Sequence, residues 1–395
     1  MPDPADVPLD PTVAAAVAAD GAKLAGIFRW LAEVEFPGYS PLYEHLALHI
    51  ADDPDITGFI TQHNRSSFAA VLFFACVRDV TLVEPDLPLA VRYAEIVAGA
   101  DPLEPDPWPL FRDAVATHRD ALAARLETRS IQTNEVGRSA ALLPAFEVVR
   151  RRFDRPLALI EIGCSAGLNL LFDQFRISYS SPGTVAKAPA DGRAVGPADS
   201  PVRLACELRG DLAPHLPTAP PAVVSRLGVD LAPVDVTDPD AVRWLEACVW
   251  PDVPHRLERF RAAVALARLD PPTIRHGNAV DLVTEAVLAV PDGAVACLDS
   301  TWVLAYFSPD ERTELHRLLD ELGADRAIGY VTAEYAENGA PWLPAAPRAT
   351  VSAGHRAPTL LGLGLWDHGR TEHRALAWMP PHGQWLDWLD PTTAA

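Results

Sequence analysis

The spacing of hydrophobic and polar positions changes once along the chain, close to residue 157. Before that point apolar residues recur three and four positions apart, as Leu42, Leu46 and Ile50 do. This spacing is typical of helices that bury one face. No run of alternating strands occurs in this part of the chain. The pattern therefore predicts an N-terminal helical region over residues 1–128.

From residue 157 onward, short apolar runs alternate with amphipathic segments. The runs expected to form strands are 157–162, 223–229, 273–276, 294–298 and 326–332, and the segments expected to form helices are 167–175, 240–249, 256–269, 279–287 and 310–322. Strands separated by helices indicate an α/β fold with a Rossmann-like, doubly wound, mainly parallel sheet. Two last runs, 360–366 and 374–379, predict an antiparallel hairpin.

A Pro- and Gly-rich interval interrupts this alternation between the first and second expected strands. We therefore expect an α/β domain over 129–395 that carries an insertion at about 176–221. Inside the interval, residues 202–208 alternate between apolar and polar side chains. This alternation predicts an inserted hairpin strand.

Composition narrows the possible partners. The chain has 395 residues, of which 49% are hydrophobic and 22% charged, and its net charge is −20. This acidity argues against general nucleic-acid binding, because phosphate contacts need clustered Lys and Arg. The longest apolar run, 68–77, is too short to span a bilayer, and the acidic N-terminus does not resemble a secretory signal. The five cysteines are scattered without a C-x-x-C pair, so we expect reduced thiols, no metal site and a cytoplasmic location.

The stretch after the first expected strand, "EIGCSAGLN" from Glu161 to Asn169, is rich in small residues. It fits two kinds of chemistry. As G-x-S-x-G it matches the turn that presents a hydrolase nucleophile, with Ser165 between Gly163 and Gly167. As a small-residue loop at the carboxyl end of a strand, it matches a site where a nucleotide-like cofactor approaches the backbone.

The hydrolase interpretation lacks two usual companions. A nucleophile elbow sits on an established sheet, but the preceding residues here are helical in pattern, and no HGGG-like oxyanion segment lies upstream. The cofactor interpretation accounts for Glu161, because an unpaired carboxylate is costly inside a buried strand unless backbone donors or a polar ligand group satisfy it. Both interpretations stay open, and the residues favour the second.

"LIEIGCSAGLN" resembles the first motif of class I S-adenosylmethionine-dependent methyltransferases, E/D-x-G-x-G-x-G followed by Asn. The resemblance implies S-adenosylmethionine as the cofactor. It also implies that its methionine part is surrounded by Glu161, Gly163, Ser165, Gly167 and Asn169. Ser165 stands where the family has its middle glycine. A dinucleotide fingerprint, G-x-G-x-x-G, is not present.

Three later segments resemble other parts of the same fold. "SRLGVDL" resembles its second strand, which implies that Asp230 holds the ribose hydroxyls. "RHGNAVDL" resembles the loop after the third strand, where Asn278 takes the place of an acid that meets the adenine amino group. Asp299, in "ACLDSTW", occupies the position after the fourth strand where many such enzymes contact substrate.

A wider resemblance covers most of the chain. The segments that carry it are "SPLYEHLA", "TRSIQTNEVGRSAALLP", "LIEIGCSAGLNLL", "SRLGVDLAPVDV", "ACVWP" and "PHGQWLDWL". Together they look like a bacterial family of unknown function with a methyltransferase-like core. In the second segment, Asn134 and Arg138 have two explanations of equal weight: they belong to a helix start, or they hold the carboxylate of the cofactor.

Four polar residues near expected strand ends are candidates for catalysis: Asp299, His276, Tyr306 and Glu334. His276, Tyr306 and Glu334 also have a structural explanation, His276 as a hydrogen-bonded side chain and the other two as partners of a neighbouring Arg. We therefore expect methyl transfer from S-adenosylmethionine to a small-molecule acceptor, achieved mainly by positioning. The alternatives are a serine hydrolase that uses Ser165 and a non-catalytic cofactor-binding scaffold. No nucleic acid and no membrane are expected as partners, and the sequence indicates no oligomeric state.

Overall fold

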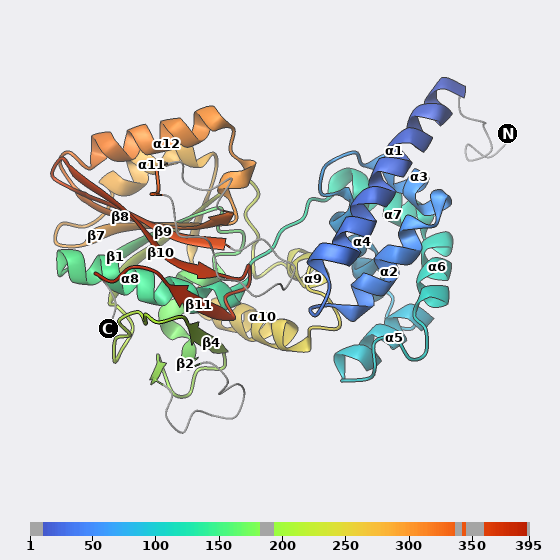
Figure 1. Ribbon diagram of the computed structural model, residues 1–395, viewed down its shortest axis with the longest axis horizontal. Coiled ribbons are helices and arrows are strands. Elements are labelled where there is room, and N and C mark those ends of the chain that lie inside the picture. Colours follow the sequence, from blue (N-terminus) through green and yellow to red (C-terminus); the bar gives the residue numbers. More distant parts are fainter. Residues whose placement is uncertain (1–10, 182–192, 336–341, 345–358, 393–395) are drawn as a thin grey trace. The chain divides into compact units, whose positions relative to one another are not determined.

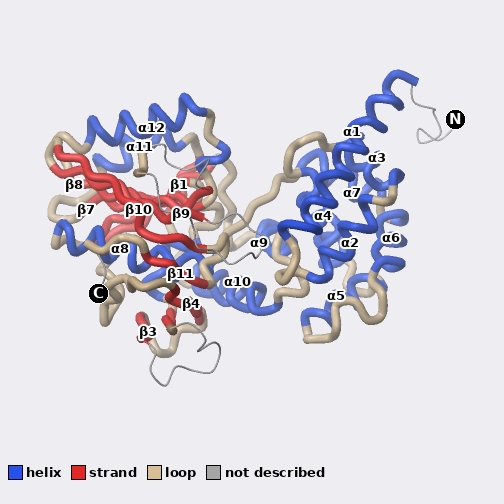
Figure 2. The backbone as a smooth tube through the Cα atoms, in the orientation of Figure 1, coloured by secondary structure: helices blue, strands red, loops and turns tan. Residues whose placement is uncertain are grey.

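The computed structural model describes residues 11–181, 193–335, 342–344 and 359–392 (Figure 1). The chain divides into two units. The first contains the residues up to Thr133 together with Arg243–Leu257, and the second contains Asn134–Val242 and the described residues from Glu258 onward. Figure 2 shows that helices make up the first unit and that the strands belong to the second. The grouping of Arg243–Leu257 with the N-terminal helices is a feature that the hydrophobic pattern does not indicate.

Between residue 11, where the described part begins, and the first strand, the regular elements are all helices, as the spacing of apolar residues predicts. In the first unit they are α1 (Pro11–Trp30), followed directly by the π-helical turn η2 (Leu31–Glu35), α2 (Pro41–Ala51), α3 (Pro54–His63), α4 (Ala69–Val83), α5 (Pro88–Val97), α6 (Trp108–Thr117) and α7 (Arg119–Thr128). Helix α2 begins at a proline, and the Ser40 side chain before it accepts a hydrogen bond from the Tyr43 N–H. Rings dominate the buried core of this unit, among them Phe28, Tyr43, Phe73, Phe74 and Phe111.

The second unit is built on one large sheet. Its strands are β1 (Leu157–Ile162), β2 (Arg176–Ser180), β3 (Arg193–Val195), β4 (Arg203–Arg209), β5 (Val223–Asp230), β6 (Thr273–His276), β7 (Val295–Thr301), β8 (Ala327–Tyr335), β9 (Thr359–Asp367), β10 (Arg370–Met379) and β11 (Trp385–Trp388). The helices that belong to it are η3 (Val136–Arg138), α8 (Ser139–Phe153), η4 (Leu168–Gln174), α11 (Ala279–Leu288), η5 (Leu304–Tyr306) and α12 (Pro309–Leu322). The chain passes between the two units within α9 (Pro239–Ala247) and within α10 (Pro254–Ala267).

Among the described residues the strand order is β3-β2-β4-β11-β10-β9-β8-β7-β1-β5-β6. The five strands β6, β5, β1, β7 and β8 are neighbours and run parallel. From β1 the chain builds outward to β5 and β6, and it then returns to the other side of β1 to form β7 and β8. The winding direction therefore reverses between β1 and β7. In open parallel sheets this reversal marks the place where ligands bind, beyond the carboxyl ends of the strands.

The remaining strands make the sheet mixed. The hairpin β9–β10 is antiparallel, as predicted, and β9 pairs antiparallel with β8. Strand β4 contains most of the alternating segment 202–208, but it pairs in parallel with both β2 and β11. The expectation of an inserted hairpin at this segment was therefore wrong in pairing, although right in predicting a strand. The fold is mixed α/β with a large, mostly parallel sheet and many helices.

The segment after Gly167 differs from the prediction. It forms the 3-10 helix η4 and not an α-helix, and Leu171 inside it has non-helical backbone angles. Strand β2 begins at Arg176, so little chain is left for a crossover helix before the next strand. The apolar periodicity of 167–175 instead reflects burial on several sides, since Leu168, Leu170, Leu171 and Phe172 are all buried.

Helices cover both faces of the parallel part of the sheet (Figure 1). On one face α11 and α12 pack on a cluster that includes Ile160, Leu298 and Tyr330. On the other face lies α8, where the side chain of Val149 contacts Gly329 so closely that a Cβ there would lie 2.6 Å from it. Because side chains alternate along a strand, the residues next to Ile160 and Leu298, which are Glu161 and Asp299, point to the α8 face.

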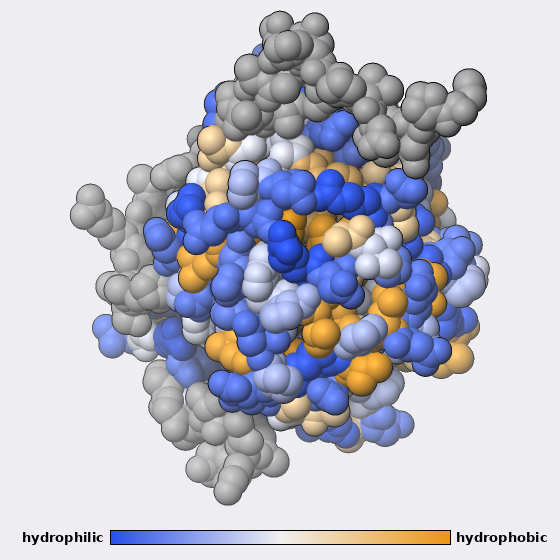
Figure 3. Space-filling view, turned by 90° about the vertical axis from the view of Figure 1, so that its right-hand side faces the viewer, coloured by the Kyte–Doolittle hydropathy of each residue, from blue (hydrophilic) through white to orange (hydrophobic). Residues whose placement is uncertain are grey.

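The surface drawn in Figure 3 is mostly hydrophilic, with apolar residues in small groups. Among the residues of the first unit whose exposure is described, the exposed large apolar side chains are Ile27, Trp30, Leu48, Phe68, Val83 and Val91, each between 37% and 50% exposed. Scattered apolar residues of this kind are ordinary on protein surfaces. No helix formed by the described residues has an apolar stretch long enough to cross a bilayer. All five cysteines are buried free thiols.

Candidate functional site

Two buried carboxyl groups face each other where the winding of the sheet reverses. Glu161 of β1 is directly opposite Asp299 of β7 in the parallel register. Each residue is only 2% exposed. Opposite residues on neighbouring strands project from the same face, and the strands lie about 4.8 Å apart. The two acids therefore form a pair on the α8 face, at the carboxyl ends of their strands.

Burial and proximity change the acidity of this pair. Burial raises the pKa of Asp299 to about 8. Burial also raises the pKa of Glu161 well above its usual value, and the neighbouring charge of Asp299 raises it further. The amide of Asn169 and the guanidinium of Arg138 act in the opposite direction on the pKa of Glu161. These shifts follow from desolvation and from the repulsion of like charges.

The loop after β1 adopts left-handed backbone conformations at alternate residues. The φ angles are +70° at Gly163, +53° at Ser165 and +67° at Gly167. A Cβ added at Gly163 would lie 1.9 Å from Cγ2 of Val303, and one at Gly167 would lie 2.8 Å from Cγ of Pro272. The chain's own side chains thus fill the space beside both glycines. These contacts explain the two glycines by the packing of the chain itself, and their place beside a cofactor stays a prediction.

Three buried polar atoms around this loop have no hydrogen-bond partner among the described residues. They are Oε2 of Glu161, Oγ of Ser165 and Nδ2 of Asn169. These side chains are 2%, 6% and 3% exposed, respectively. The other end of the Asn169 amide is engaged, because Oδ1 accepts a hydrogen bond of 2.7 Å from the Ser139 hydroxyl. Since most buried polar groups are paired, three unpaired atoms in and beside one loop indicate a place for a polar ligand or for ordered water.

Asp230 and Asn134 hold the same loop in place. The Asp230 carboxylate accepts the Ser165 N–H at 2.7 Å and the Ala232 N–H at 2.8 Å. Oδ1 of Asn134 accepts the Leu168 N–H at 2.9 Å, at the start of η4. Asn134 therefore caps a helix, but not the one that follows it in sequence. Carboxylate oxygens accept more than one hydrogen bond, so Asp230 retains acceptor capacity beyond the two backbone donors.

Arg138 lies over the carboxyl end of β7. It is 6% exposed, its Nε donates to the Pro381 carbonyl at 3.0 Å, and its Nη1 donates to the carbonyl and hydroxyl oxygens of Thr301 at 3.1 Å. Its guanidinium is 5.8 Å from the ring centroid of Trp302. Trp302 itself has φ +60°, an uncommon conformation for a bulky residue. A fixed positive charge is thus held next to the acidic pair.

Glu334 belongs to the opposite face of the sheet. Asp299 is opposite Val331 of β8, and Glu334 lies an odd number of residues further along, so it points away from the pair. Its Oε1 accepts the backbone N–H groups of Val303 and Leu304 at 3.0 and 3.1 Å. Burial raises the pKa of Glu334 to about 7, although these two hydrogen bonds lower it. Glu334 thus holds the loop after β7 in place through these hydrogen bonds. Its carboxyl group also titrates near neutral pH.

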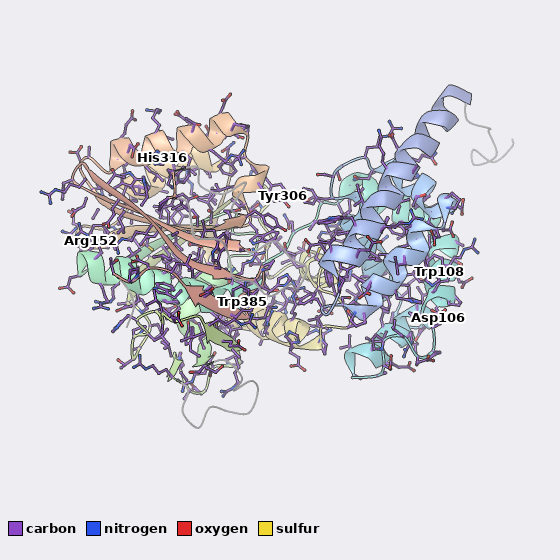
Figure 4. All side chains as sticks on the ribbon, in the orientation of Figure 1. Asp106, Trp108, Arg152, Tyr306, His316 and Trp385 are labelled. Carbon is purple, nitrogen blue, oxygen red and sulfur yellow. The ribbon has the colours of Figure 1, made fainter. Side chains whose placement is uncertain are left out.

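Three of the expected residues are less closely grouped. His276 is exposed at the end of β6, and β5 separates that strand from β1. Asn278 caps α11 by accepting the Val280 N–H, and its Nδ2 donates to Glu311 at 2.9 Å. Tyr306 is 58% exposed in η5, which follows β7, and Figure 4 shows it far from Arg152 at the other end of the unit. The structure groups Glu161, Asp299, Ser165 and Asn169 closely, with Asp230, Asn134 and Arg138 around them.

Sequence patterns missed part of the surroundings. Ser139 positions Asn169, and Glu135 accepts a hydrogen bond of 2.6 Å from Arg259. The C-terminal segment also packs here: a Cβ at Gly383 would lie 2.3 Å from the Gly137 carbonyl oxygen. The glycine in "PHGQW" is the only local indication of this close approach, since its φ is +73°. Among the described residues, no group of three or more His, Cys, Asp or Glu side chains is arranged to hold a metal ion.

Comparison with known proteins identifies a family but no activity. Residues 25–388 match the family DUF2332, described as an uncharacterized protein conserved in bacteria, and the chain belongs to this family. No curated protein matches the sequence. The resemblance to a bacterial family of unknown function is thereby confirmed for most of the chain.

Proposed function

We propose that this member of the DUF2332 family binds S-adenosylmethionine and transfers its methyl group to a small-molecule acceptor. One observation carries the proposal. Three buried polar atoms have no partner among the described residues, one on Glu161 near the end of β1, one on Ser165 in the loop after β1, and one on Asn169 in η4. They lie where the winding of the parallel strands reverses, which is the usual ligand position in such sheets. The residues of the loop fit a ligand with a donor group for the carboxylate and an acceptor for the amide.

The strand order supports the choice of ligand class. Numbered along the chain, the five parallel strands have the order 3-2-1-4-5, which is that of doubly wound nucleotide-binding sheets. We assign Glu161 and Asn169 to the methionine part, with Arg138 and Asn134 on its carboxylate. We assign Asp230 to the ribose hydroxyls and Asn278 to the adenine. The existing bonds of Asn278 to Val280 and Glu311 leave it less capacity than Asp230 has.

The bound cofactor would supply an electrophilic methyl group on a sulfonium. The chain would bind the acceptor beyond the carboxyl ends of β7 and β8, where Trp302 and Tyr306 follow β7 and Glu334 is the last residue but one of β8. A side chain with a pKa near neutral serves well as a general base, and burial gives Glu334 a pKa of about 7. Glu334 would accept a proton only from an acceptor that arrives protonated. Otherwise the chain would act by alignment and by exclusion of water.

Isothermal titration with S-adenosylmethionine and with its demethylated product, S-adenosylhomocysteine, tests the proposal. We expect binding to the wild-type chain and a roughly 10- to 100-fold loss of affinity in Glu161→Gln, which removes one charged hydrogen bond. Glu147→Gln is the matched control, because Glu147 is also buried but both of its oxygens bind Arg150. Absence of binding by a folded wild-type chain would contradict the proposal. Binding without turnover on any acceptor would indicate the scaffold.

A serine hydrolase is the second candidate, favoured by one observation. Ser165 has φ +53° between two glycines on a tight turn after a strand, and a nucleophile elbow has such a strained turn. Against it, the Ser165 hydroxyl contacts no described histidine, whereas serine nucleophiles need an adjacent base. A fluorophosphonate probe distinguishes the two. Stoichiometric labelling that is lost in Ser165→Ala supports the hydrolase, and no labelling excludes it.

A further inference from the structure

The acidic pair differs from an ordinary buried ion pair in having no cation bonded to it. No described basic side chain forms a salt bridge with Glu161 or Asp299, and Oε2 of Glu161 has no hydrogen-bond partner in the described part of the chain. Two carboxylates opposite each other on adjacent strands repel strongly at low dielectric. Two carboxyl groups in such a position cannot both be ionised at neutral pH, and one retains a proton.

We propose that Glu161 and Asp299 together select a positively charged ligand group, and that binding of this group expels the proton that the empty pair holds. This inference rests on the proposed function and names the part of the ligand that the pair recognises, the ammonium group of its methionine end. In the step, a carboxyl O–H bond breaks, the proton passes to the solvent buffer, and the incoming ammonium takes over its hydrogen bond. The net charge of the site is unchanged.

The groups around the pair are compatible with this exchange. Asp230 at the end of β5 adds negative potential, and Arg138 in η3 opposes it. Cys164 in the loop stays a neutral thiol, because burial and then the charge of Glu161 raise its pKa well above its usual value. Asn169 neighbours Glu161, and its Nδ2 donors have no partner among the described residues. The pair is therefore the group here that can release a proton on binding a cation.

Titration calorimetry at pH 6, 7 and 8 in two buffers of different ionisation enthalpy tests the inference. The probes are S-adenosylmethionine, S-adenosylhomocysteine and 5′-methylthioadenosine, of which the last lacks the ammonium group. For the wild-type chain we expect about one proton released for each of the first two ligands. Their affinity should rise up to tenfold per pH unit, since each released proton links binding to pH. Methylthioadenosine should bind weakly and release no proton.

Asp299→Asn is the informative variant. It removes the repulsion that adds to burial in raising the pKa of Glu161, so Glu161 releases its proton at a lower pH than in the wild-type chain. We expect less proton release at pH 8, a weaker pH dependence of the affinity for S-adenosylmethionine, and binding that persists. Glu147→Gln, in the second half of α8, should keep the wild-type pH dependence.

The possible outcomes separate a failure of the inference from a failure of the proposed function. Binding of S-adenosylmethionine without proton release overturns the inference and leaves the proposed function standing. Proton release that is unchanged in Asp299→Asn, or equal with methylthioadenosine, also overturns the inference. No binding of any probe by the folded chain overturns both. If Asp299→Asn fails to fold, the comparison of the two charged ligands with methylthioadenosine on the wild-type chain decides the question.

Discussion

The two units each bury acidic side chains to the same degree, but they treat them differently. In the helical unit, Asp79 is 2% exposed and both of its oxygens are paired, one with Nε of Arg125 at 2.8 Å and the other with Nε of Arg243 at 2.9 Å. In the sheet unit, Glu161 and Asp299 are buried to the same 2% and face each other. The described residues place no salt-bridging cation on either of them.

This difference in pairing indicates which of the two buried acidic sites serves a function. A buried carboxylate with two arginine partners is complete within the fold, and its place in the chain is explained by stability alone. A buried pair of carboxyl groups with an unpaired oxygen destabilises the folded chain. Such a cost persists at sites that serve a ligand or a reaction. The predictions below test this difference, from the largest expected effect to the smallest.

Asp79→Asn should destabilise the helical unit by about 3 kcal/mol. The substitution leaves two half-buried guanidinium groups without their counter-charge, and breaking a buried ion pair in this way is strongly destabilising. Chemical denaturation followed by circular dichroism measures the loss. An effect below about 1 kcal/mol would show that Asp79 is no better matched to its surroundings than the acidic pair.

Asp299→Asn should have the opposite sign and stabilise the ligand-free chain at pH 8, by about 2 kcal/mol. The pKa of Asp299 is about 8 in the folded chain and about 4 when unfolded. Between these two pH values the folded state therefore binds more protons than the unfolded state. The stability that Asp299 contributes is fully present below about pH 4 and is lost as the pH rises to about 8. The advantage of the variant should accordingly grow from pH 5 to pH 8. Thermal unfolding at each pH measures it, and an advantage that shrinks with pH would contradict the assignment.

Two buried serines extend the comparison at a smaller scale. The Ser40 hydroxyl donates to Asp252 at 2.8 Å and accepts the Tyr43 N–H, whereas the Ser165 hydroxyl has no partner among the described residues. We expect Ser40→Ala to cost about 1 kcal/mol, as the loss of a helix cap does. Ser165→Ala should cost less than about 0.5 kcal/mol, because no hydrogen bond is lost. Equal losses in denaturant titrations would mean that Ser165 has a structural partner.

Much of the fold follows from local patterns. Strands β1 and β6 have the predicted bounds of 157–162 and 273–276. Strand β1 is a short apolar run, and β6 lies between clear turn residues. The region 167–175 was misassigned, since its apolar residues are buried on several sides and carry no single period. The parallel pairing of β4 with β2 and β11 depends on contacts between distant segments, which local alternation does not encode.

The candidate site was predictable only in part for the same reason. Glu161 stands out in the sequence because a charge in an apolar strand needs an explanation. That Asp299 lies directly opposite it depends on the register between β1 and β7, which are far apart in sequence. Ser139 and Arg259 have unremarkable sequence surroundings, and their roles appear only once Asn169 and Glu135 are placed beside them.

The most direct test is a crystal structure of the chain in complex with S-adenosylmethionine or its demethylated product. We predict that the ligand lies beyond the carboxyl ends of β1, β5 and β7, with its ammonium group within hydrogen-bond distance of Oε2 of Glu161 and next to Asp299. Nδ2 of Asn169 should also gain a partner. Ordered water alone at these atoms under saturating ligand, or a ligand bound elsewhere, would contradict the assignment of the acidic pair as its binding site.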